Sequence, residues 1–172
     1  MTRELETFLR PLYQDLDGVS RFDDVERIGN IARRLTGPSR ELDLLVLFHL
    51  LGTWLEKLGN LSRVKLAIAD LTEEELRRTA ASIRRLDAPE SEAERAVAAA
   101  ILIDGAGVRG FAEKLSRSRR EGQSILDVAR TEVAQPPAWM DERARNWLAA
   151  RSAERRRVCQ LLFAEMAGED LT

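Results

Sequence analysis

The spacing of apolar residues constrains this chain most, because they recur roughly every three or four positions in nearly every segment. No run alternates apolar and polar residues for more than a few positions, as a half-buried strand would. Residues three and four apart share one face of an α-helix, so each segment gains an apolar side for a core. The sequence therefore predicts an all-α fold, a compact arrangement of about seven to nine helices.

Two capping boxes mark helix starts. Thr72 precedes Glu75 by three residues, and Ser91 stands in the same relation to Glu94. In such a box the hydroxyl and the carboxylate each accept a hydrogen bond from the other residue's backbone N–H. Helices are therefore predicted to begin just after Thr72 and just after Ser91, the second extending to about Ile103.

The most apolar helix is predicted at about 40–58, where Ser39 supplies an N-cap and Gly59 ends the pattern. We expect it to be the most buried helix of the chain. The other helices are expected at about 3–16, 22–35, 61–69, 108–120, 123–133 and 141–167.

Length and composition favour one domain over residues 1–172, since 172 residues with 44% hydrophobic content can close one sizeable core. The 27 Lys and Arg nearly balance the 29 Asp and Glu, so net charge gives no support to nucleic-acid binding. The longest apolar stretch, 42–55, is shorter than the ~20 residues that span a bilayer, and no membrane association is expected.

The N-terminus lacks the apolar stretch and cleavage site of a secretory signal, so a cytoplasmic location is expected. A single cysteine, Cys159, cannot form an internal disulfide, and its apolar neighbours favour a buried, inert thiol. A long, apolar final helix commonly pairs with its own copy, which makes a homodimer one alternative.

Candidate chemistry is sparse. Ser and Cys hydrolase triads need a histidine base, and the chain has only His49. Three glycines between 105 and 110 favour a turn between helices over a phosphate loop, because no strand precedes them. Arg109, Arg117 and Arg120 are candidates for anion binding, as are residues 155–157, although an exposed charged helix face is the commoner outcome.

Three segments resemble the HD-domain metal-dependent phosphohydrolases. These are Arg21–Ile28, then Leu47–Gly52 with its Leu-Phe-His-Leu-Leu-Gly, then Ile103–Ala112 with its Asp-Gly-Ala-Gly. They occur in the family's order over about residues 20–120. The resemblance implies an HD-like helical core there, with the helices of 123–167 packed on it.

In the family a histidine of one helix, a His-Asp pair of the next and a later aspartate hold a metal that activates water for phosphate-ester or nucleotide hydrolysis. Here these ligand positions fall on Asp24, on His49 and Leu50, and on Ala99. Asp104 matches the family's outer, structural aspartate. Leucine and alanine cannot bind a metal, so the resemblance implies a vestigial site without metal, cofactor or catalytic residues.

Three hypotheses remain open. The first is a catalytically inactive HD-like domain, a pseudoenzyme that acts as a binding, scaffolding or regulatory module for an unknown protein or small molecule. The second is an enzyme with a rebuilt site, a phosphohydrolase built on Asp24, His49 and Asp104 with help from Asp23 or Glu56. Glu56 follows His49 by seven residues and would share its helix face. The third is an unrelated helical interaction protein.

Overall fold

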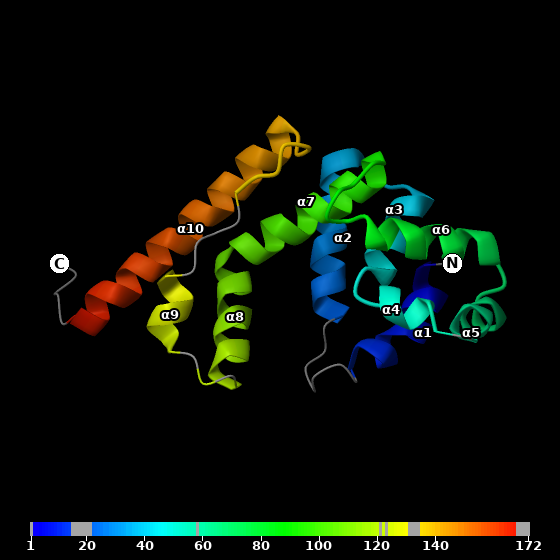
Figure 1. Cartoon of the computed structure of the whole chain (residues 1–172), viewed down its shortest axis with the longest axis horizontal. Coiled ribbons are helices and arrows are strands. Elements are labelled where there is room, and N and C mark those ends of the chain that lie inside the picture. Colours follow the sequence, from blue (N-terminus) through cyan, green and yellow to red (C-terminus); the bar gives the residue numbers. More distant parts are fainter. Residues whose placement is uncertain are drawn as a thin grey trace. The chain divides into compact units, whose positions relative to one another are not determined.

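The fold is all-α, as predicted. The computed structural model describes residues 2–14, 22–57, 59–120, 122, 124–130 and 135–167, and within these ranges it contains helices and no strand. The helices are α1 (Thr2–Gln14), α2 (Phe22–Thr36), α3 (Arg40–Phe48), α4 (Gly52–Leu55), α5 (Asn60–Ala67), α6 (Glu73–Arg84), α7 (Glu92–Ala106), α8 (Val108–Arg120), α9 (Ile125–Arg130) and α10 (Glu142–Ala167) (Figure 1).

The described residues form ten helices, one more than the seven to nine predicted, because the helix predicted at 40–58 is divided into two. It ends at Phe48 with His49 as its C-cap, and the chain enters a helix again at Gly52. A Cβ on Gly52 would lie 2.7 Å from Cγ2 of Ile83, so the missing side chain permits a close approach of α4 to α6. The apolar run continues through the break, and periodicity alone therefore does not reveal it.

The chain divides into two compact units, residues 1–100 and 101–172, and the division falls within α7. The single domain predicted for 1–172 stays a prediction, and the HD-like region expected at about 20–120 includes parts of both units. Among the described residues, no helix is both long and apolar enough to cross a membrane.

The first unit is organised around α3 and α6, which pack against each other. Helices α1 and α2 contact α3, whereas α4 and α5 contact α6. Six of the nine residues of α3 are buried, as its apolar composition predicts. Tyr13 of α1 adds a polar tie, since its buried hydroxyl donates to the carbonyl of Leu47 at 2.6 Å while its ring meets Phe22 edge to face.

In the second unit, α8, α9 and α10 contact one another. Their shared core contains Phe111, Val128 and Cys159, one residue from each helix. Cys159 is buried and carries no disulfide, as expected. The predicted turn between helices is confined to Gly107, which separates α7 from α8, while Gly105 and Gly110 lie within those two helices.

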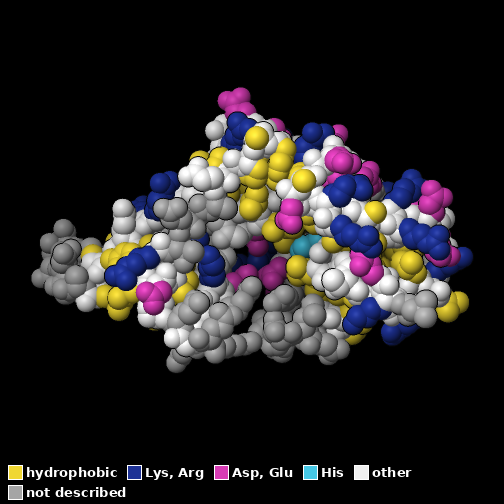
Figure 2. All heavy atoms as spheres, viewed as in Figure 1, with side chains coloured by type: hydrophobic (Ala, Val, Ile, Leu, Met, Phe, Trp, Pro, Cys, Tyr) yellow, Lys and Arg dark blue, Asp and Glu magenta, His cyan; other side chains and the backbone are white. Residues whose placement is uncertain are grey.

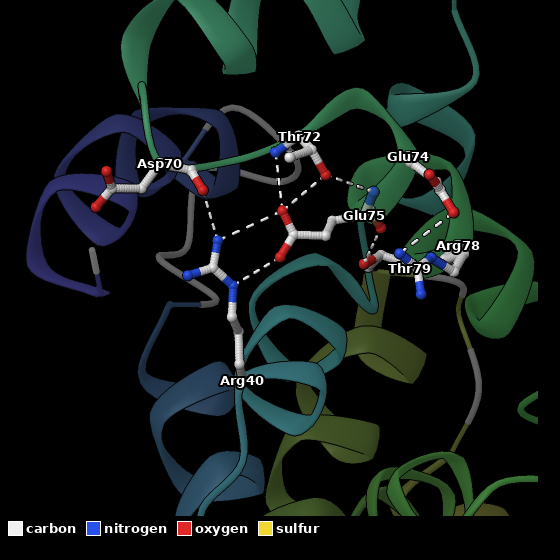
Figure 3. Close-up of polar contacts among 7 residues, drawn as sticks. All are labelled: Arg40, Asp70, Thr72, Glu74, Glu75, Arg78 and Thr79. Carbon is white, nitrogen blue, oxygen red and sulfur yellow. Dashed lines mark hydrogen bonds and ion pairs between the residues drawn. The ribbon is translucent and has the colours of Figure 1, made fainter.

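The first capping box forms as predicted and also joins two helices (Figure 3). The Thr72 hydroxyl accepts from the Glu75 N–H at 3.1 Å, and the Glu75 carboxylate accepts from the Thr72 N–H at 2.8 Å. Arg40, the first residue of α3, donates to the same carboxylate at 2.7 Å and to the carbonyl of Asp70. The helix cap of α6 therefore also anchors α3.

The second capping box also both caps a helix and joins it to another. Ser91 accepts from the Glu94 N–H at 3.1 Å, and Glu94 accepts from the N–H groups of Ser91 and Glu90. The Glu94 side chain is fully buried and pairs with Arg85, the C-cap residue of α6. The cap of α7 thus holds the far end of α6.

Both cap carboxylates have pKa values lowered from 4.5 to about 2. For Glu75 the main cause is the hydrogen bond from the Thr72 backbone, followed by the bond from Arg40. For Glu94 burial acts in the opposite direction and raises the pKa, but hydrogen bonds from Ser82, Glu90, Arg85 and Ser91 together outweigh it. Both side chains therefore stay ionised well below the pH at which an unfolded glutamate takes up a proton.

We expect acid to destabilise the fold through these two groups. A carboxylate with a lowered folded-state pKa contributes stability that is complete above about pH 5 and is lost as the pH falls towards 2. The free energy of unfolding, measured in urea at a series of pH values, should decline across that window. Glu75→Gln/Glu94→Gln should flatten the decline, and an unchanged slope in that variant would contradict the assignment.

Candidate functional site

His49 is buried, as expected, with 8% of its surface exposed. It caps the C-terminus of α3, and its Nδ1 lies 2.7 Å from the carbonyl oxygen of Val46. A carbonyl can only accept, so Nδ1 carries the proton in this contact. The end of its own helix therefore fixes the orientation of the imidazole ring.

Asp24 lies in the first turn of α2, and its carboxylate accepts a hydrogen bond from Arg27 at 2.7 Å. Both side chains are about one-fifth exposed. In the HD family these two positions converge on one ion, so the resemblance predicts a direct contact between Asp24 and His49 that would tie α2 to α3. The carboxylate is bound by the neighbouring turn of its own helix instead, because Arg27 is placed one turn away and carries the opposite charge.

The other positions of the vestigial site differ in their surroundings. Leu50 lies in the turn after α3 and is 38% exposed, whereas Ala99 is buried in α7. Asp104 is half-buried and belongs to the second unit, while the other four residues belong to the first. Across the described ranges, no three His, Cys, Asp or Glu side chains gather closely enough to hold a metal ion.

Glu56 does not share a helix face with His49, which corrects the geometry expected for a rebuilt active site. The break after Phe48 puts Glu56 at the C-cap of a different helix, α4. Its carboxylate accepts from Arg84 of α6. Asp23, the other auxiliary candidate, is exposed in the first turn of α2.

The candidate anion-binding arginines do not form a described site. Arg109 is exposed and lies 3.6 Å from the carboxylate of Glu113, one turn further along α8. Arg117 and Arg120 belong to the same helix, but their side chains lie outside the described part of the chain. Arg109 thus behaves as a solvated charge on a helix face.

A cavity of about 420 Å³ lies in the first unit between α3, α6 and the start of α7. Its charged lining is internally balanced, because Arg40 pairs with Glu75 and Arg85 pairs with Glu94. Basic and acidic side chains are likewise interspersed over the visible face of this unit (Figure 2). Two of the arginines that line the cavity, Arg40 and Arg85, connect neighbouring helices, and the third, Arg78, pairs with Glu74 within α6.

A larger cavity, about 590 Å³, lies in the second unit, and we call it the arginine groove. It is lined by residues 129 and 130 of α9, by Gln135 and Pro136, and by one face of α10 from Arg145 to Phe163. Four arginines line the groove: Arg130, Arg145, Arg155 and Arg156. None of its described lining residues is acidic.

The groove has a buried base and a charged rim. Leu148, Ser152 and Cys159 are at most 8% exposed, and the Ser152 hydroxyl donates to the Leu148 carbonyl at 2.7 Å. Arg155 is also buried, with its guanidinium carbon 5.3 Å from the centre of the Phe111 ring. Arg130, Arg145 and Arg156 are exposed. Of the predicted anion-binding residues, only members of the 155–157 run belong to this groove.

Comparison with known proteins identifies no matching family model, no matching curated protein and no matching solved structure. The class that the structure defines is an all-helical protein with ten described helices in two compact units. The likeness to the HD domain rests on the three sequence segments.

Proposed function

We propose that this protein is a non-catalytic, HD-like helical binding module that acts in the cytoplasm. The observation that carries the proposal is the set of contacts made by Asp24 and His49, the two polar residues at the family's ligand positions. Asp24 is paired with Arg27, and the His49 ring is anchored on the Val46 carbonyl. Exposed Leu50 and buried Ala99 stand where the family has further ligands. These residues support packing and folding better than they support metal chemistry.

One observation favours the alternative, a phosphohydrolase with a rebuilt site that includes Asp24, His49 and Asp104. Metal-binding histidines commonly donate one ring N–H to a backbone carbonyl, which orients the other nitrogen. The contact between His49 Nδ1 and Val46 has that form. A metal analysis combined with a hydrolysis assay separates the two functions.

We expect purified protein to contain no stoichiometric metal. Elemental analysis should give the same low metal content for the wild type and for His49→Ala. Neither protein should hydrolyse a panel of phosphate esters and nucleotides, even with added Mn²⁺, Mg²⁺, Fe²⁺ or Zn²⁺. The reason is that a catalytic metal usually needs about three protein ligands.

About one equivalent of Mn, Fe or Zn in the wild type, lost in His49→Ala, would refute this proposal. Hydrolysis that depends on His49 would do the same and would restore the enzyme hypothesis. Circular dichroism of both proteins shows whether the variant keeps its helical fold.

A further inference from the structure

The arginine groove is long and follows a single helix face. Its α10 residues recur every three or four positions, from Arg145 through Leu148, Ser152 and Cys159 to Phe163. At 1.5 Å per residue, the first and last of these lie about 27 Å apart along the helix axis. The groove can therefore accommodate about five turns of a partner helix laid along it.

The base of the groove is apolar where it is deepest. Leu148 and Cys159 are buried there, and Phe163 is partly buried. Ser152 adds little polarity, because its hydroxyl is bonded within α10. Three residues beyond Phe163 on the same helix, Met166 is 56% exposed. An apolar surface of this kind loses contact with water when an apolar helix face covers it.

The rim gives the groove a positive charge in a chain whose formal net charge is -2. Arg145 donates to the carbonyl of Ala138, and Arg130 lies 3.8 Å from Asp127, with both side chains of that pair about two-thirds exposed. Exposed ion pairs of this kind contribute little to the stability of the fold. The guanidinium groups of the rim therefore have N–H donors that can bind the carboxylates of a partner.

We propose that the arginine groove binds an acidic amphipathic helix of a partner protein. The apolar face of that helix would lie on the base, with residues at i, i+3, i+4 and i+7, and its carboxylates would meet Arg130, Arg145 and Arg156. A second copy of this chain fits less well, because the rim would then face like charges. The inference rests on the proposed binding function and gives it a partner class.

A displayed peptide library provides the test. Peptides of about 18 residues, the length of the groove as a helix, are selected on phage against the full chain. Enriched sequences should combine leucine or aromatic residues at helical spacing with flanking Asp and Glu. Synthetic copies should bind Arg145→Glu/Arg156→Glu at least about tenfold more weakly, since reversed rim charges repel the peptide.

The matched control is Arg143→Glu/Arg157→Glu, which makes the same charge change at two exposed α10 positions outside the groove. It should bind nearly as the wild type does. Enriched peptides without the acidic, amphipathic pattern would overturn the proposal, as would equal loss in both double variants. A dimer of the free protein that Arg145→Glu/Arg156→Glu dissociates would identify a second copy as the occupant instead. Metal-dependent hydrolysis would refute the proposed function while leaving peptide binding measurable.

Discussion

Replacing Glu94 with alanine should lower the free energy of unfolding by about 2–4 kcal/mol. The side chain is fully buried and accepts hydrogen bonds from the backbone of Glu90 and Ser91. It also pairs with Arg85 at the end of α6. Truncation removes a helix cap and an ion pair together, and it leaves two backbone donors without their acceptor. Urea unfolding followed by circular dichroism measures the loss.

Glu92→Ala is the matched control, because Glu92 is exposed in the same first turn of α7. It should cost less than about 0.5 kcal/mol. Glu94→Gln keeps an acceptor oxygen but not the charge, and it should fall between the wild type and Glu94→Ala. Equal effects of Glu92→Ala and Glu94→Ala would show that the cap contributes only its charge near the helix N-terminus.

Gly110→Ala should destabilise the second unit by about 2–4 kcal/mol. A Cβ on Gly110 would lie 2.6 Å from the Cα of Gly105, well inside the contact distance of two carbons. The obstacle is backbone, so no rotamer change can relieve it. The first turn of α8 would have to move away from the end of α7. Thermal and urea unfolding of the full chain would report the change.

Gly105→Ala provides the opposite control within the same segment. Its Cβ would meet nothing within 4 Å, and the residue lies in α7. Alanine is favoured over glycine in a helix by roughly 0.5–1 kcal/mol, so this variant should be slightly more stable than the wild type. A stable Gly110→Ala protein would mean that the two turns do not approach each other closely in solution.

The features predicted well from the sequence are those set by neighbouring residues. Both capping boxes form because Thr72 and Glu75, and likewise Ser91 and Glu94, need only local backbone geometry. The division of the 40–58 helix is not visible in the sequence, because the apolar residues continue through positions 50 and 51. Gly52 accommodates Ile83, and nothing near Gly52 indicates that contact.

The candidate site shows the same limit. Residues 155–157 are visible in the sequence as a basic run, but Arg130 and Arg145 lie outside it. Arg145 lies on the same face of α10 as Arg156, three turns before it, whereas Arg130 joins them only because α9 packs beside α10. The Asp24 contact was predicted from a family likeness, whereas the structure pairs Asp24 with Arg27 three residues away. Helix spacing alone would have suggested that pair.

The shared caps of the first unit change how its helices can open. In most helices the first turn frays independently, because its N–H groups have no intrahelical acceptors. Opening the start of α6 also releases Arg40 of α3, and opening the start of α7 also releases Arg85 at the end of α6. Local unfolding at either helix start therefore also breaks a contact with another helix, and we expect α3, α6 and the start of α7 to open together.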